Sequence, residues 1–104
     1  MARMVVIYRT PENVDDFDRH YFEVHIPLAK NLPGLRKYEV SKGSIISLAG
    51  ASEAYLIATL HFDDLLGIKE AFASQCGLAC AADRRVLAPN DADVQMFLFD
   101  SCEV

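Results

Sequence analysis

Apolar residues follow two patterns along this chain, short runs of branched and aromatic residues and longer stretches with helical spacing. The short runs predict four strands, over residues 1–9, 35–41, 54–62 and 93–101. After the first strand, apolar side chains recur every three or four residues, as on the buried side of an amphipathic helix: Phe17, Tyr21, Val24, Leu28 and Leu32. We therefore expect a helix between the first and second strands.

A second helical region follows the third strand. Asp63 or Asp64 is placed to cap a helix whose apolar residues follow at helical spacing. The pattern breaks near residues 74–77, and a shorter helical piece over 78–88 ends at Pro89. The resulting order, βαββαβ, is that of ferredoxin-like folds. We predict an α+β subunit in which helices cover one face of a four-stranded antiparallel sheet.

Both faces of this predicted sheet are apolar. In the last strand, Met96 and Leu98 point to one side while Phe97 and Phe99 point to the other. An antiparallel sheet with one face in water would instead alternate apolar and polar residues. The helices can cover one face only, and monomers seldom expose apolar patches beyond several hundred Å². We therefore expect a homodimer in which two sheets pack face to face, a dimeric α/β barrel.

Length and charge limit the remaining choices. A chain of 104 residues is expected to form one domain over 1–104. The net charge is −5 and no basic face is evident, so nucleic acid is not an expected partner. No apolar run approaches the roughly 20 residues that span a bilayer, and the apolar run near the N-terminus is too short for a secretory signal. We expect a cytoplasmic protein with no membrane partner.

The cysteines and glycines point to no familiar chemistry. Cys76, Cys80 and Cys102 form no C-x-x-C pair, and an odd number of cysteines argues against a disulfide framework. Cys76 and Cys80 share one helix face, but no histidine or acidic cluster nearby completes a metal site. We expect them to be small buried side chains, and expect neither a metal nor another cofactor. Glycine-rich phosphate loops and the G-x-S-x-G pattern are absent, which disfavours kinases and hydrolases.

A proline inside the first predicted helix raises a question about the histidine close before it. Pro27 cannot donate a backbone hydrogen bond, so the helix should kink or restart at Ile26–Pro27. His25 lies beside this break. It is either a capping side chain satisfied by free backbone carbonyls, or a histidine that points into a pocket and transfers protons. The residues alone leave both interpretations open.

The region around this histidine resembles one known family. The stretch "FDRHYFEVHIPLAKNLPGLRKYEV", residues 17–40, carries an aromatic residue, a tyrosine, His-x-Pro-Leu-Ala, then Leu-Pro-Gly-Leu-Arg and an aromatic residue on the next strand. This spacing, without gaps, is similar to that of EthD-like proteins in the dimeric α/β-barrel superfamily. The family is named after a protein associated with bacterial ethyl tert-butyl ether degradation. Its wider relatives include cofactor-free monooxygenases, haem-degrading enzymes, cyclases and decarboxylases.

The resemblance implies a cofactor-independent oxidoreductase, or an oxygenase-associated protein, that binds a small, partly apolar organic ligand. His25 is then the candidate general acid or base. Four further residues are candidate ligand contacts: Tyr8, Tyr21, Tyr38 and His61. Two alternatives stay open, a non-catalytic dimeric accessory or binding module, and a lyase or cyclase that uses His25 without oxygen.

Overall fold

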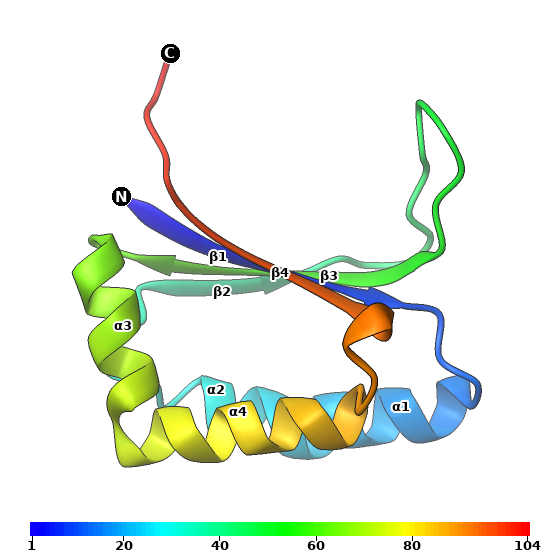
Figure 1. Cartoon of the computed structure of the whole chain (residues 1–104), viewed down its shortest axis with the longest axis horizontal. Helices are drawn as coiled ribbons and strands as arrows, with labels where there is room; N and C mark the ends of the chain where they lie inside the picture. The colour runs from blue at the N-terminus through cyan, green and yellow to red at the C-terminus, as the bar shows by residue number, and fades with distance from the viewer.

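The four predicted strands form one antiparallel sheet in the computed structural model, which describes all 104 residues (Figure 1). Along the chain the strands are β1 (Ala2–Arg9), β2 (Lys37–Val40), β3 (Ala54–Phe62) and β4 (Val94–Asp100). Their order across the sheet is β2-β3-β1-β4, so β1 pairs with both β3 and β4. The predicted antiparallel sheet of a ferredoxin-like fold is confirmed.

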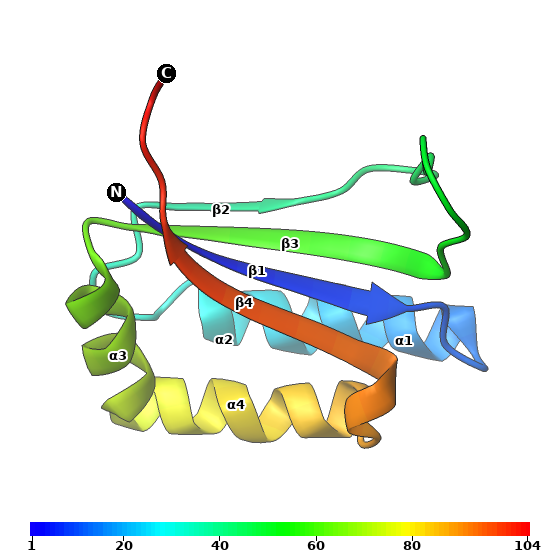
Figure 2. The same cartoon turned by 45° about the horizontal axis from the view of Figure 1, so that its top comes forward.

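All of the helices lie on one side of this sheet (Figure 2). They are α1 (Val14–His20), the π-helical turn η1 (Tyr21–His25), α2 (Ile26–Ala29), α3 (Leu65–Ala73), α4 (Gln75–Leu87) and the short 3₁₀ turn η2 (Asp91–Asp93). None of them has the length and apolar content that a bilayer-crossing helix requires. The βαββαβ order predicted from the sequence is confirmed, since α1, η1 and α2 form one continuous helical segment.

The helix between β1 and β2 changes its winding in the middle. The backbone N–H of Ile26 donates to the carbonyl of Tyr21, five residues back, which makes η1 wider than an α-helical turn. Pro27, which has no N–H, lies in the first turn of α2. The predicted kink or restart at Ile26–Pro27 corresponds to a change from π to α winding, because His25 and Ile26 both keep helical backbone angles.

This wide turn decides which side chains face the sheet. The buried side chains of this helical segment are spaced by four residues: Phe17, Tyr21, His25 and Ala29. The prediction that Val24 and Leu28 are buried is wrong, because Val24 is 43% exposed and Leu28 only half-buried. In a regular helix of about 3.6 residues per turn, a four-residue series drifts around the axis. The π turn takes up more residues and keeps the series on one face.

In the second helical region, α4 begins three residues before the start that the sequence pattern predicted. The predicted piece over 78–88 begins at Gln75 instead, where the Ser74 hydroxyl accepts the Gly77 N–H at 3.1 Å. A Cβ at Gly77 would lie 2.1 Å from the Ala71 carbonyl oxygen. The glycine that resembled a helix break in the sequence therefore permits the close approach of α3 and α4.

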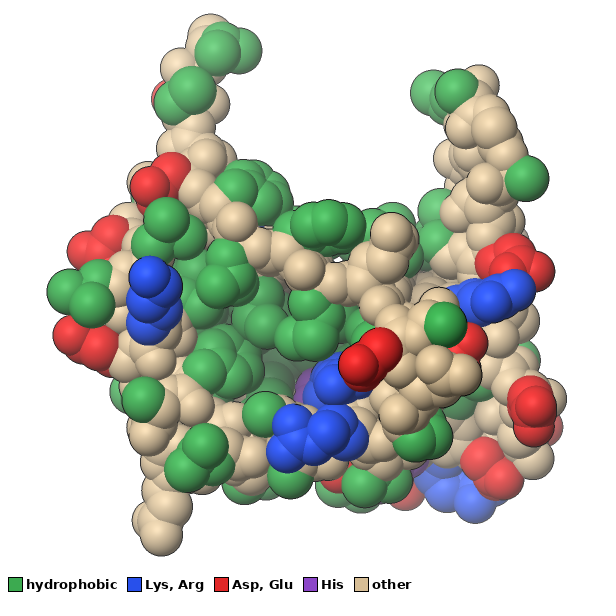
Figure 3. All heavy atoms as spheres, in the orientation of Figure 1, with side chains coloured by type: hydrophobic (Ala, Val, Ile, Leu, Met, Phe, Trp, Pro, Cys, Tyr) green, Lys and Arg blue, Asp and Glu red, His purple; other side chains and the backbone are tan.

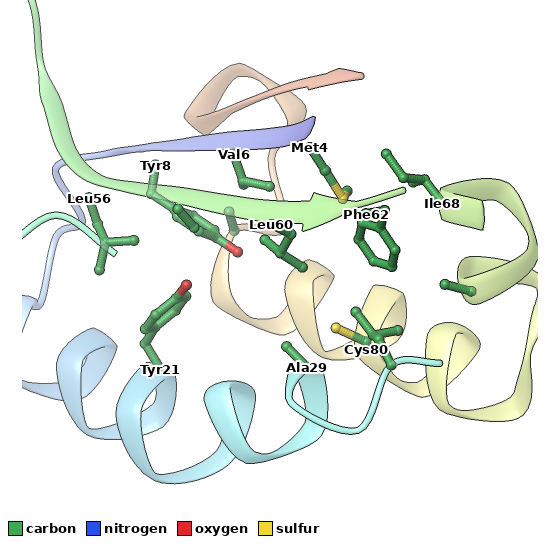
Figure 4. Packing of buried hydrophobic residues seen from close by; sticks show 14 of the residues in the cluster. Met4, Val6, Tyr8, Tyr21, Ala29, Leu56, Leu60, Phe62, Ile68 and Cys80 are labelled. Carbon is green, nitrogen blue, oxygen red and sulfur yellow. The ribbon is translucent and has the colours of Figure 1, made fainter. Parts of the chain in front are cut away.

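The core lies between the sheet and the helices (Figure 4). Alternate residues of β1 and β3 point into it: Met4, Val6, Tyr8, Leu56, Ala58, Leu60 and Phe62. From the helices come Tyr21, Ile68 and Cys80. Many of the side chains that line the cavity described below belong to this layer.

The opposite side of the sheet, which we call the open face, has no helix over it. Its apolar members are Val5, Ile7, Ile57, Phe97 and Phe99. Phe97 is 48% exposed and Phe99 is 42% exposed. The β2–β3 loop and the C-terminal tail both extend beyond this face (Figure 1), and the loop carries the almost fully exposed Ile46 and Leu48.

Candidate functional site

A cavity of about 220 Å³ lies between the sheet and the helices. Its walls are mostly apolar, with side chains that include Met4, Val6, Ala29, Ala58, Leu60 and Met96. In Figure 3 the molecule is hollowed below β4, where hydrophobic side chains surround the hollow and basic side chains lie at its edge. Pockets for drug-sized ligands occupy roughly 300–1,000 Å³, so this one suits a smaller organic molecule.

Three tyrosines bring hydroxyl groups into this apolar space. Tyr21 and Tyr38 form a hydroxyl–hydroxyl hydrogen bond of 2.5 Å between η1 and β2. One proton of the pair is used in that bond, which leaves the other for a ligand. The rings of Tyr8 and Tyr21 pack edge to face at 5.7 Å, and their hydroxyls point toward the same space (Figure 4).

The hydroxyl of Tyr8 makes no hydrogen bond to another protein group. Arg3 Nη1 is the only fully buried side-chain nitrogen or oxygen without a hydrogen-bond partner, so the unbonded Tyr8 hydroxyl is not fully buried. Because Tyr8 lines the cavity, its hydroxyl is open to that space. Burial raises the pKa of Tyr38 to about 12, and burial also raises the pKa values of Tyr8 and Tyr21. All three groups therefore stay protonated at neutral pH and act as hydrogen-bond donors.

His25 lies at the end of the π turn and lines the same cavity. Its side chain is 8% exposed, and its Nδ1 lies 2.9 Å from Asp83 Oδ2 on α4. A carboxylate can only accept, so Nδ1 carries the proton and Nε2 keeps its lone pair. Nε2 faces the Cys80 sulfur at 4.0 Å. The buried ring thus presents a basic nitrogen to the cavity side of α4.

Two effects oppose each other in setting the charge of His25. Burial lowers the pKa of His25, and its hydrogen bond and attraction to Asp83 raise that pKa again without cancelling the effect of burial. The net pKa is below the ordinary value, so the imidazole is neutral at neutral pH. A neutral imidazole with a fixed tautomer can accept a proton, as a general base does.

The structure distinguishes the two interpretations of His25 left open by the sequence. Its side chain makes no capping hydrogen bond to the start of α2. The ring lies instead among the cavity-lining residues and is hydrogen-bonded to α4. His25 therefore lies in the wall of the cavity rather than at a helix cap, while its catalytic role stays a prediction.

Asp83 is the partner of His25 that sequence reasoning missed. Its second oxygen, Oδ1, lies 2.8 Å from His20 Nε2, so one carboxylate bridges two histidines. The side chain of Asp83 is only 12% exposed. One signal was available: aspartate is a poor helix former, and Asp83 lies inside a helix three residues after the buried Cys80, away from any cap position.

Two of the three cysteines lie in the packed part of the molecule, and the third, Cys102, is exposed. Cys80 is buried and Cys76 half-buried on the same side of α4, and the Cys76 thiol donates to the Leu28 carbonyl at 3.3 Å. Burial raises the pKa of Cys80 to about 11, so it is a thiol at neutral pH. No group of three or more histidine, cysteine or acidic side chains is arranged to hold a metal ion.

The structure does not bring His61 to this cavity, although the sequence grouped it with the three tyrosines. His61 lies between Leu60 and Phe62 on β3, which point to the helices, so its own side chain points to the open face. There its Nε2 lies 2.8 Å from Glu39 Oε1 on β2. The other four candidates, His25 and the three tyrosines, do line one cavity.

Comparison with known proteins identifies the family of the chain. The EthD domain family matches residues 9–90. The chain belongs to the EthD family. An uncharacterised 11.0 kDa protein of Rhodococcus erythropolis, from the thcB–thcC intergenic region, is 34% identical over 84 residues, which are 80% of each chain.

Solved structures share the fold along the whole chain. A crystal structure of an EthD-family protein from Bacillus halodurans has a TM-score of 0.87 at 28% identity, covering 98% of this chain and 99% of that one. SnoaB, a cofactor-independent oxygenase from Streptomyces nogalater, has a TM-score of 0.68 at 14% identity, covering 99% and 94%. Two further neighbours, with TM-scores of 0.67 and 0.64, are described as dimeric ferredoxin-like proteins. At such low identity these last three show the fold alone.

Proposed function

We propose that this EthD-family protein binds a small, partly apolar organic compound in the cavity and acts on it as a cofactor-independent oxidoreductase. The observation that carries the proposal is the His25–Asp83 pair, in which a neutral imidazole is held at 2.9 Å from a carboxylate on the wall of an apolar cavity. His25 is the proposed general acid or base. Tyr8, Tyr21 and Tyr38 are the proposed hydroxyl contacts that orient the ligand.

The proposed reaction needs no bound cofactor. Nε2 of His25 takes a proton from an activated C–H bond of the substrate, which leaves the bonding electron pair as a carbanion. The carbanion adds to O₂, and the resulting peroxide anion recovers the proton from the imidazolium. Loss of water from a CH–OOH group then gives a ketone, so that a CH₂ group and O₂ become C=O and H₂O. The apolar walls keep water from protonating the carbanion first.

A single set of variants separates this activity from its alternatives. His25→Gln removes the base, and Tyr55→Phe is a matched control because its hydroxyl bonds Asp18 outside the cavity. With small aryl ketones and phenols as trial substrates, oxygen uptake by the His25 variant should fall about 10²–10⁴-fold. Tyr55→Phe should leave it unchanged.

Each other outcome identifies a different function. Product formation without oxygen uptake, again lost in His25→Gln, would indicate a lyase or cyclase. Saturable binding without turnover of any compound would indicate an accessory or binding module. Turnover that His25→Gln leaves intact would refute the role of His25, and a variant that only melts at lower temperature would assign His25 a structural role.

We propose further that the protein is a homodimer in which two open faces pack together. The exposed Phe97 and Phe99, together with the apolar tips of the β2–β3 loop, provide an apolar surface on one side of the sheet. The dimeric description of two fold neighbours supports this self-association. A cytoplasmic location belongs to the same proposal, because the cysteines are free thiols, as is usual in a reducing compartment.

A further inference from the structure

Arg84 of α4 is a nearly buried cation without a close anionic partner. It follows Cys80 by one helical turn and lines the same cavity, with its side chain 13% exposed. Its Nη1 donates to the Ala88 carbonyl at 3.0 Å. The nearest carboxylate oxygen paired with it belongs to Asp91, at 4.0 Å from Nη2, and the Asp91 side chain is 97% exposed. An ion pair of that length and exposure contributes little.

The carboxylate next to Arg84 in the sequence does not neutralise it. The two carboxylate oxygens of Asp83 form hydrogen bonds with His25 Nδ1 and His20 Nε2. A buried guanidinium retains several N–H donors, and leaving its charge without a partner is unfavourable. The other polar side chains that line the cavity are the tyrosine hydroxyls, the Cys80 thiol, the neutral His25 and Arg85, whose side chain is exposed to solvent. The cavity therefore has apolar walls and a net positive charge, and Arg84 is its less exposed cation.

Arg84 acts electrostatically on the candidate ligand contacts. Its charge counteracts part of the upward effect of burial on the pKa of Tyr8, and it contributes to the lowered pKa of His25. The guanidinium, the free Tyr8 hydroxyl and the proposed base all line the same cavity. A negative charge formed at this point of the cavity would therefore meet a cation and a hydroxyl donor together.

We propose that Arg84 makes the cavity a site for an organic oxyanion on a small apolar body, with the anionic oxygen bound by Arg84 and the Tyr8 hydroxyl. The inference rests on the proposed function for the location of the ligand and, for the second of its two sources, for the action of His25 as a base. Two sources supply this chemistry, a carboxylate that is charged before it binds, and an enolate or phenolate that forms when His25 takes the proton. In the second case Arg84 stabilises the charge that the base creates.

Matched pairs of ligands test this site. Benzoate and benzamide have the same ring and differ in charge, and 4-nitrophenol reports its own ionisation because only its phenolate absorbs strongly in the visible. Calorimetry of the full-length protein should show benzoate bound at least about tenfold more tightly than benzamide, as expected for one charge-assisted hydrogen bond. Bound 4-nitrophenol should be more ionised than the free compound at the same pH. If only the preference for benzoate is observed, the natural ligand is a carboxylate that is charged before it binds. If only the increased ionisation of 4-nitrophenol is observed, the ligand is an enol or phenol that loses its proton in the cavity.

The variants separate charge from shape. Arg84→Gln should remove the preference for benzoate, Arg84→Lys should keep part of it, and Arg19→Gln, an exposed arginine on α1, should have no effect. Equal binding of benzoate and benzamide that Arg84→Gln leaves unchanged would overturn the anion site and leave the apolar cavity as a binding site. Failure of every probe to bind at millimolar concentration would overturn the anion site and the proposed cavity together.

Discussion

Replacing Asp83 by asparagine tests whether this carboxylate sets the state of His25. The change keeps the size of the side chain but removes its charge, and it replaces one of the two acceptor oxygens, of which Oδ2 lies 2.9 Å from His25 Nδ1, by an amide NH2 group. In the native protein Asp83 raises the pKa of His25 and burial lowers it. Without Asp83 the effect of burial is unopposed. The pKa of His25 should therefore fall further, by about one pH unit or more, as expected on losing a nearby opposite charge.

Nitrogen NMR of the imidazole ring measures both consequences of Asp83→Asn. The native protein should show His25 with a proton on Nδ1 only, and the variant should show a mixture of the two neutral forms at neutral pH, because an amide can donate as well as accept. The loss of one charge-assisted hydrogen bond at a nearly buried position should also lower the free energy of unfolding by about 1.5–3 kcal/mol. A His25 pKa that stays the same or rises in the variant would refute the reasoning.

Three further changes test the interface, the pH dependence and the helix packing. Phe97→Asp should shift the protein from dimer to monomer in light scattering, since a central interface aromatic contributes about 2 kcal/mol or more; an unchanged dimer would place the interface elsewhere. The pKa of His25 is lowered in the folded protein, so the unfolded chain binds its proton more readily, and stability should fall as the pH drops below about 6.5. His25→Gln should show a smaller loss of melting temperature between pH 7 and 5 than the native protein; an equal loss would contradict this. Gly77→Ala should destabilise the protein by about 1–3 kcal/mol in urea titration, because its methyl group would meet the Ala71 carbonyl at 2.1 Å, and a neutral effect would show that α3 and α4 can separate freely.

The sheet could be predicted closely because its pattern is local. Short runs of branched and aromatic residues predicted the limits of β1, β3 and β4 to within one residue, and the apolar side chains on both sides of β4 indicated the open face. β2 is shorter than the predicted 35–41, since only Lys37–Val40 keep regular strand geometry. The N–H groups of Arg36 and Ser41 still donate to β3 carbonyls, so the pairing extends past the regular strand. A run of apolar residues predicts that a strand is present more accurately than it predicts the first and last residues of that strand.

The helical register could not be predicted because it depends on a π turn. A pattern of regular helical spacing selects Val24 and Leu28, and the wide turn at Tyr21–His25 selects His25 and Ala29 in their place. Pro27 signalled an irregular helix without specifying which one.

The partners of His25 lay beyond sequence reasoning because they are distant in the chain. Asp83 is 58 residues away and reaches His25 only when α4 packs beside η1. In the sequence it is one acid before two arginines, which resembles an ordinary solvated turn of helix. His61 is the candidate that the structure places elsewhere, because the alternation of β3 turns its side chain to the open face.

The chemistry proposed for this cavity therefore depends on how α4 is held. Cys80, Asp83 and Arg84 are spaced by three and four residues, so one side of α4 supplies the contact to Nε2, the acceptor for Nδ1 and the cation of the cavity. The close contact between α4 and α3 at Gly77 fixes how this side of α4 is oriented toward the cavity. A Gly77→Ala protein that still folds should then show an altered pKa of His25 as well as lower stability, although Gly77 touches neither the histidine nor the cavity. Unchanged imidazole titration in such a variant would mean that the His25–Asp83 contact adjusts independently of the helix packing.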